Sequence, residues 1–225
     1  MIDIRAYMRE LVGTLKTVFE NRLLYVGLQG SYLRAEATEK SDIDVMVVID
    51  EMKPNDLKEY KKVLKEIGNY DKSCGFICGS KELLNWNPQE ICHLLNTTAD
   101  YYGTLEDFVP KYNRRDIADY IKLSSGNLYH MLCHRYVYDD IEKNKMKLPL
   151  IYKDIFYILQ NVYYLENGEF IQTKSKMESI LCGSDRKIWM LLNEITNEKE
   201  CEFDSAFEIV FDWCCEILER VNRYE

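Results

Sequence analysis

The sequence has no apolar run approaching the ~20 residues that a membrane-spanning helix requires, so we expect no membrane partner. No apolar segment typical of a signal peptide precedes Asp3 and Arg5, which favours a cytoplasmic protein. Basic residues are few, because 29 Lys and Arg stand against 38 Asp and Glu, a formal net charge of −9. Such a surface repels phosphate polymers and suits a small cationic molecule or a protein partner better. Broad binding to nucleic acid is therefore not expected.

Paired CxxC motifs, which are typical of structural zinc sites, are absent as well. Three short Cys and His groupings occur, and we interpret them as half-buried thiols and helix-face histidines rather than metal ligands. They are Cys74-x3-Cys78, Cys92-His93 and His130-x2-Cys133-His134. Because the eight cysteines show no repeated spacing, we expect reduced thiols and no disulfide framework.

The first third of the chain alternates between helical and strand patterns. Apolar residues at steps of three and four predict helices over residues 2–20 and from Pro54 to Ile67. Continuous apolar runs predict strands, with a short helical turn between the first two. The expected strands are 23–28, 43–49 and 74–78. This order predicts a small mixed sheet covered by helices.

From Lys81 onward the pattern is helical, without a convincing strand. The expected helices are 83–95, 116–138, 150–165, 185–195 and 203–221. We therefore predict an α+β fold, with a sheet-containing domain over residues 1–100 and an all-helical domain over residues 101–225. The boundary is expected near the turn-prone segment 102–110.

Two carboxylates stand one residue apart at the head of the second expected strand. Residues two apart on a strand point to the same face, with Cα atoms about 6.6 Å apart, so Asp42 and Asp44 converge while Ile43 faces the other way. Two like charges held so close need a compensating cation. Mg²⁺ fits, because it binds one or two protein carboxylates and completes its octahedron with water and phosphate.

A Gly-Ser pair precedes these carboxylates by ten residues. Gly30 allows a tight turn and a close approach to a ligand, and Ser31 offers hydroxyl and amide donors to a phosphate. Arg34, one helical turn later, can bring a guanidinium to the same phosphates. Together these residues indicate a site for a metal ion and a phosphorylated ligand.

The spacing Gly30-Ser31, ten residues, Asp42-Ile43-Asp44-Val45 resembles the signature of the DNA polymerase beta-like nucleotidyltransferase superfamily. Gly30-Ser31-x2-Arg34 with Ser41-Asp42-Ile43-Asp44 resembles its minimal and antibiotic-modifying branches, and the helical half resembles the bundle of aminoglycoside and lincosamide nucleotidyltransferases.

The resemblance implies transfer of a nucleoside monophosphate from a nucleoside triphosphate, with ATP expected, to a hydroxyl of a small molecule. Asp42 and Asp44 would hold Mg²⁺, and Gly30, Ser31, Arg34 and Ser41 would bind the nucleotide. By the same analogy the chain is expected to form a homodimer.

The third expected strand departs from the family pattern, because many members carry a third carboxylate there. Residues 72–78 contain no acid, Cys74 stands about where the acid would fall, and Asp71 is the nearest catalytic candidate. A general base could instead be Asp100, Asp116 or Asp119. Two other functions stay open: an antitoxin-type nucleotidyltransferase that adenylylates a protein, and a non-catalytic nucleotide-binding protein.

Overall fold

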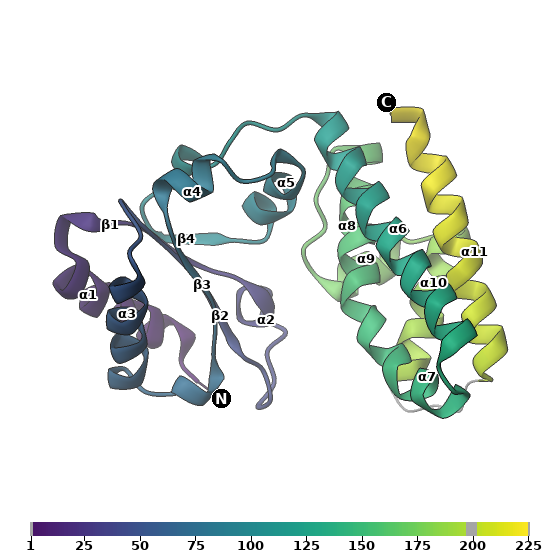
Figure 1. Cartoon of the computed structure of the whole chain (residues 1–225), viewed down its shortest axis with the longest axis horizontal. Helices are drawn as coiled ribbons and strands as arrows, with labels where there is room; N and C mark the ends of the chain where they lie inside the picture. The colour runs from purple at the N-terminus through teal and green to yellow at the C-terminus, as the bar shows by residue number, and fades with distance from the viewer. Residues whose placement is uncertain (1, 197–201, 225) are drawn as a thin grey trace. The chain divides into compact units, whose positions relative to one another are not determined.

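The computed structural model describes residues 2–196 and 202–224. The chain divides into two compact units, Met1–Lys111 and Tyr112–Glu225, drawn from purple to teal and from green to yellow in Figure 1. The boundary predicted between residues 100 and 101 falls inside a strand of the first unit, so the division comes later in the chain. The α+β fold class predicted from the sequence is confirmed.

Unit 1 contains one four-stranded sheet in the order β3-β2-β1-β4. β2 and β3 are parallel, whereas β1 is antiparallel to both β2 and β4. Its α-helices, strands and 3-10 helices (η) are α1 (Ile4–Phe19), η1 (Glu20–Arg22), β1 (Leu23–Leu28), α2 (Gly30–Leu33), β2 (Ile43–Ile49), α3 (Pro54–Glu66), η2 (Tyr70–Lys72), β3 (Ser73–Gly79), α4 (Ser80–Leu84), α5 (Pro88–Asn96), β4 (Ala99–Tyr102) and η3 (Leu105–Phe108).

One face of the sheet is covered by α1 and α3 (Figure 1). The α1 helix begins after Asp3, whose carboxylate accepts hydrogen bonds from the amides of Arg5 and Ala6. Its apolar stripe, with Leu11 and Leu15 fully buried, packs against the alternate residues of β2 that point the same way. This core holds the strands rigid where the chain turns between β1 and β2.

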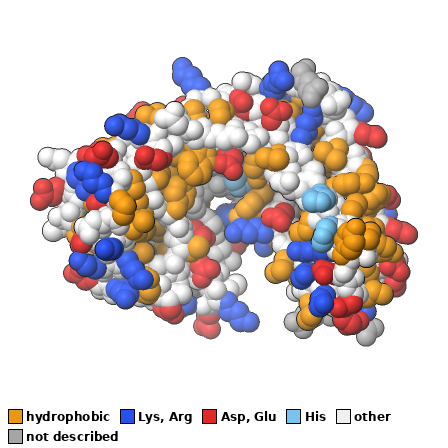
Figure 2. All heavy atoms as spheres, viewed as in Figure 1, with side chains coloured by type: hydrophobic (Ala, Val, Ile, Leu, Met, Phe, Trp, Pro, Cys, Tyr) orange, Lys and Arg blue, Asp and Glu red, His pale blue; other side chains and the backbone are white. Residues whose placement is uncertain are grey.

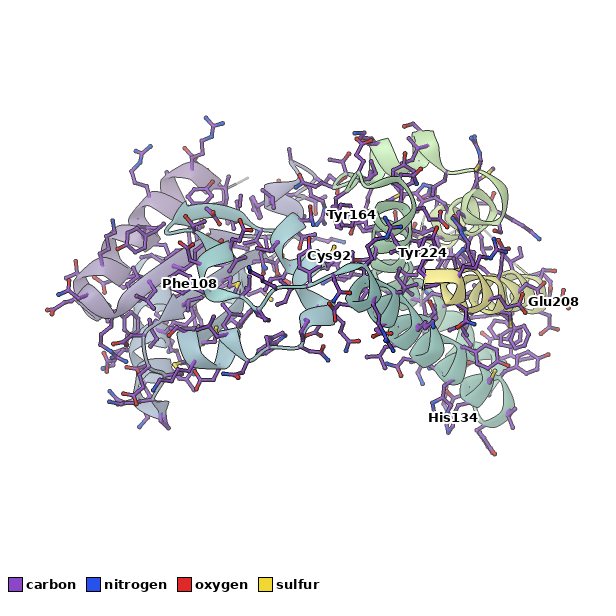
Figure 3. The ribbon with its side chains drawn as sticks, turned by 90° about the horizontal axis from the view of Figure 1, so that it is seen from above. Cys92, Phe108, His134, Tyr164, Glu208 and Tyr224 are labelled. Atoms are coloured by element: carbon purple, nitrogen blue, oxygen red, sulfur yellow. The ribbon has the colours of Figure 1, made fainter. Side chains whose placement is uncertain are left out.

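The segment that follows α4 covers part of the other face of the sheet, because Trp86 stacks on Phe76 of β3. A single helix over residues 83–95 was expected here, and that prediction is wrong. The chain forms two helices because Asn87 caps the start of α5 and Pro88 occupies its first position. Cys92, labelled in Figure 3, lies on α5 and is fully buried.

A fourth strand, β4, was missed by the sequence prediction. Residues 99–102 pair with β1 in antiparallel register, although Ala-Asp-Tyr-Tyr is too short and too polar to show an alternation of its own. Its pairing with β1 is a tertiary contact, which local patterning does not report. The predicted absence of strands after Lys81 is therefore wrong at this position.

Unit 2 is helical within its described residues. The long α6, α8, α10 and α11 match the expected helices closely, whereas two short helices, α7 and α9, were not expected. Figure 3 labels His134 on α6 and Glu208 on α11, two helices in contact. The elements are α6 (Arg114–Tyr138), α7 (Ile141–Lys147), η4 (Leu148–Ile151), α8 (Tyr152–Asn167), α9 (Lys174–Ile180), α10 (Gly183–Thr196), α11 (Phe203–Val221) and η5 (Asn222–Tyr224).

A buried ionic network joins three helices of unit 2. Asp185 of α10, almost fully buried, accepts hydrogen bonds from Trp213 Nε1 and Arg220 Nη1, each at 2.8 Å. Arg220 of α11 also donates through Nε to Glu166 of α8 at 2.6 Å. Because each charge has a partner, the network ties α8, α10 and α11 together.

Three further properties of the described residues concern membrane spans, surface charge and cysteines. In the part of the chain that the structure describes, none of the helices has both the length and the apolar character needed to cross a bilayer. Acidic and basic side chains are interspersed over the face shown in Figure 2. Seven cysteines are free thiols, and Cys201 lies outside the described residues.

Candidate active site

The turn after β1 presses directly on a carboxylate of β2. Gly30 has φ +69°, and a Cβ built on it would lie 1.9 Å from Oδ2 of Asp44. The preceding residue, Gln29, donates its amide to the Asp44 carbonyl oxygen at 2.8 Å. Only glycine satisfies both the left-handed backbone and the close approach, so the turn and the carboxylate form one unit.

The two aspartates of the motif stand at the amino end of β2. Ile43 is fully buried in the core beneath α1 and α3, so Asp44 points to the opposite face of the sheet. Asp42 directly precedes the strand and is exposed. Ile43 and Asp44 therefore alternate as the sequence predicts, whereas Asp42 lies just outside the strand.

Cys74 lies beside Asp44 on the neighbouring strand. The two residues are paired in the parallel register of β2 and β3. Partial burial and the charges of Asp44 and Asp42 raise the pKa of this thiol, so it stays protonated at neutral pH.

The donor set suits magnesium. It comprises the carboxylate oxygens of Asp42 and Asp44, which are hard ligands, beside a glycine turn that leaves room for phosphate. Among residues 2–196 and 202–224, His, Cys, Asp and Glu side chains nowhere form a group of three arranged to hold a metal. A site with two carboxylates fits Mg²⁺, which takes its other ligands from water and phosphate.

The other predicted nucleotide-binding residues surround the same turn. Ser31 lies in the first turn of α2 and is half-buried. Arg34 Nε donates to Glu36 Oε2 at 2.9 Å, and its side chain is only 14% exposed. The Ser41 hydroxyl accepts the Thr38 amide at 2.8 Å and so shapes the loop that leads to Asp42. Their binding of nucleotide stays a prediction.

Three of the candidates for the third acid lie on elements other than β1, α2 and β2. Asp71 is exposed in η2, three residues before Cys74, and within the described residues it makes no hydrogen bond or ion pair. Asp116 caps α6 by accepting the Asn113 amide at 2.7 Å. Asp119 is exposed on α6. Position 74, opposite Asp44, is thus occupied by a thiol rather than an acid.

The sequence does not predict the surroundings of Asp100. It lies on β4, where its Oδ1 accepts a 2.7 Å hydrogen bond from the buried Tyr25 hydroxyl. The only sequence signal for this arrangement is Gly27, because a side chain there would meet the Tyr25 hydroxyl at 2.1 Å.

Residues 8–124 match the family described as "Nucleotidyltransferase domain", which covers more than half of the chain. The chain belongs to this family, and the resemblance noted from its Gly-Ser and Asp-x-Asp spacing is confirmed. It is therefore a nucleotidyltransferase enzyme, which moves a nucleotidyl group from a nucleotide to an acceptor.

Individual relatives agree with this class. A protein of Methanocaldococcus jannaschii, whose name provisionally makes it a protein adenylyltransferase, is 33% identical over 69 residues, 31% of this chain and 68% of that protein. The crystal structure of the spectinomycin adenyltransferase AAD(9) from Enterococcus, with ATP and spectinomycin, superposes with a TM-score of 0.60 at 15% identity. It covers 96% of this chain and 99% of that one, which shows that the folds are alike in both units.

Proposed function

We propose that this enzyme transfers the adenylyl group of ATP to a hydroxyl of a small-molecule acceptor, in a Mg²⁺-dependent reaction. The observation that carries the proposal is the contact between the Gly30 turn and the Asp44 carboxylate, with Asp42 directly before the same strand. This contact supports a shared site, because the residues proposed for phosphate and those proposed for the metal touch each other.

Each residue has a role that follows from its chemistry. The Gly30 and Ser31 amides and the Ser31 hydroxyl donate hydrogen bonds to the outer phosphates. Asp42 and Asp44 would hold Mg²⁺, which would supply positive charge beside the phosphates. Glu36 holds the guanidinium of Arg34, directly after α2, by accepting a hydrogen bond from its Nε.

The small-molecule acceptor is supported by the extent of the structural likeness. The spectinomycin adenyltransferase matches this chain over both units, including the helical one, and its structure contains ATP and spectinomycin. The net charge of −9 also favours a cationic acceptor over a nucleic acid. We therefore propose an antibiotic-type, amine-bearing acceptor, with aminoglycosides and lincosamides as the first compounds to test.

Transfer to a protein is the second candidate, because the Methanocaldococcus relative is named for that activity. That similarity is limited to 69 residues of this chain. A superposition on a toxin–antitoxin structure with AMP-PNP has a TM-score of 0.33 at 18% identity, over 58% of this chain and 93% of that one, and adds no argument. We therefore place the small-molecule acceptor first.

The test is adenylyl transfer from α-labelled ATP to a panel of aminoglycosides, aminocyclitols and lincosamides, with and without Mg²⁺. Asp42→Asn and Asp44→Asn are expected to abolish transfer, whereas Asp107→Asn, which removes the same charge from η3, should keep it. Asp71→Asn tests the predicted third catalytic acid. If no compound of the panel and no co-purified protein causes ATP to release pyrophosphate, the proposal is refuted.

Two further expectations concern the state of the protein in the cell. A homodimer stays a prediction that sedimentation analysis would test. A cytoplasmic location also stays a prediction, and fractionation of the producing cells would test it.

A further inference from the structure

The Asp100 carboxylate lies on the same face of the sheet as the proposed metal ligands. Asp100 is paired with Gly27, and Gly27 is paired with Met46 of β2. Directly paired residues point to the same side of a sheet, and so do residues two apart on one strand. Asp44, two residues before Met46, therefore shares a face with Asp100.

The separation of the two acids excludes Asp100 as the general base. Two strand spacings and two residues along the strand place the Cα atoms of Asp44 and Asp100 about 12 Å apart. A general base must reach the attacking hydroxyl within a hydrogen bond, and that hydroxyl has to meet the phosphate beside Asp44. Asp100 is instead positioned to contact a remote part of the acceptor.

A buried tyrosine fixes the orientation of this carboxylate. The Tyr25 side chain is fully buried, and its hydroxyl crosses over Gly27 to reach Asp100 Oδ1 at 2.7 Å. Burial, and then the neighbouring Asp100, raises the pKa of Tyr25, so the phenol remains a proton donor. One carboxylate oxygen is thereby held in place while the residue as a whole is exposed.

The charge of Asp100 has no counterion within the described residues. Its one partner there is the neutral Tyr25 hydroxyl, and no Lys, Arg or His lies within salt-bridge distance. A fixed and exposed carboxylate without a cation is suited to bind an ammonium group.

Polar groups occupy the space between the two acids. The side-chain nitrogen Nε2 of Gln29 donates a hydrogen bond to the Thr98 hydroxyl at 2.8 Å, and the backbone N–H of Gln29 donates one to the Asp44 carbonyl oxygen. The face therefore runs from Asp44 through Gln29 and Thr98 toward Asp100. Such a path offers hydrogen bonds to the hydroxyl groups of a ring.

We infer that Asp100 binds an ammonium group of the acceptor, and that the acceptor is an amine-bearing cyclic polyol whose reactive hydroxyl is about one ring away from that amine. The inference rests on the transfer to a small molecule proposed above, and it names the residue that selects the substrate class. Tyr25 is the positioning residue that orients Asp100.

The test compares two probes that differ in their amines. 2-Deoxystreptamine and the amine-free myo-inositol are titrated calorimetrically into the nucleotide-free protein, with wild type, Asp100→Asn and Asp107→Asn in parallel. Asparagine can still accept the Tyr25 hydrogen bond, so the fold is expected to persist. Mg²⁺-dependent binding of a non-hydrolysable ATP analogue is measured on every variant, which tests the proposed function separately.

Wild type and Asp107→Asn should bind 2-deoxystreptamine at least about tenfold more tightly than myo-inositol, and Asp100→Asn should lose this preference. Tyr25→Phe should lose part of it, with nucleotide binding unchanged. Equal affinity of wild type for both probes, absence of binding, or an equal loss in both aspartate variants would overturn the inference. If the wild-type protein does not bind the nucleotide analogue, that result counts against the proposed function and not against Asp100 as an ammonium-binding residue.

Discussion

Replacement of Gly30 by alanine tests whether the contact between the glycine turn and Asp44 organises the site. The added Cβ would lie 1.9 Å from Asp44 Oδ2, whereas real contacts essentially never fall below 3.0 Å. The carboxylate must therefore move by about 1 Å, and a displacement of that size at a reacting centre can cost about 100-fold in rate. We expect Gly30→Ala to lose Mg²⁺-dependent nucleotide binding by at least tenfold.

Gly68 is a matched control for the backbone strain. Its φ is +81°, so alanine is strained there as well, but a Cβ at that position meets nothing within 4 Å. Left-handed backbone costs a non-glycine residue roughly 1–2 kcal/mol. Both variants should therefore lose about that much free energy of unfolding, and only Gly30→Ala should lose nucleotide binding.

The assay pairs urea unfolding with calorimetric titration of a non-hydrolysable ATP analogue, with and without Mg²⁺. If Gly30→Ala binds the nucleotide as well as Gly68→Ala does, the contact with Asp44 has no role in the site. If both variants lose binding equally, the effect comes from strain and not from the carboxylate. Either result would refute the reasoning.

Three further predictions concern other contacts. Cys74→Asp should raise Mg²⁺ affinity in a calorimetric titration, because it adds a negatively charged carboxylate beside Asp44, while Cys74→Ser, which adds only a neutral hydroxyl, should not; equal affinities would contradict this. Asp56 accepts two hydrogen bonds from Arg22 at 2.9 Å, and these bonds lower the pKa of the Asp56 carboxyl. The ion pair therefore stabilises the fold fully above about pH 4, the pKa of an unfolded Asp, and this stabilisation is lost as the pH falls through the lower pKa of the folded state. Asp56→Asn should lower the free energy of urea unfolding by about 2 kcal/mol at pH 7, and a difference from wild type that persists in acid would count against the ion pair. Arg220→Met should destabilise unit 2 by about 3 kcal/mol in the same assay, because Asp185 keeps only Trp213 as a partner; a neutral effect would show that the network contributes little.

The strands and helices with a strong local pattern were predicted well. β1, β2 and α11 have the bounds that their apolar runs and stripes indicate. Such patterns arise because each element must bury one face, and this need is visible in every short window of sequence. The prediction of a single helix over residues 83–95 was wrong because it followed the apolar pattern and gave too little weight to Asn87-Pro88, which is a helix-start signal.

β4 illustrates what local patterning leaves out. Its four residues are short and polar, and they are a strand because β1 offers them an open edge. The position of Asp100 on the sheet face, and hence its link to Tyr25, follows from that pairing. Cys74 is similar, because its place opposite Asp44 depends on the parallel register of β2 with β3.

By itself the sequence determined the α+β fold class and, through its resemblance to a known family, the enzyme class, because helix and strand periodicities and the spacing of Gly30-Ser31 from Asp42 and Asp44 are local properties. The tertiary structure alone decided which groups surround that pair: the Gly30 backbone against Asp44, a thiol where a third acid was expected, and Asp100 two strands away. The physical reason is that register and strand order arise from contacts between segments distant in the chain, whose free energy no single segment contains.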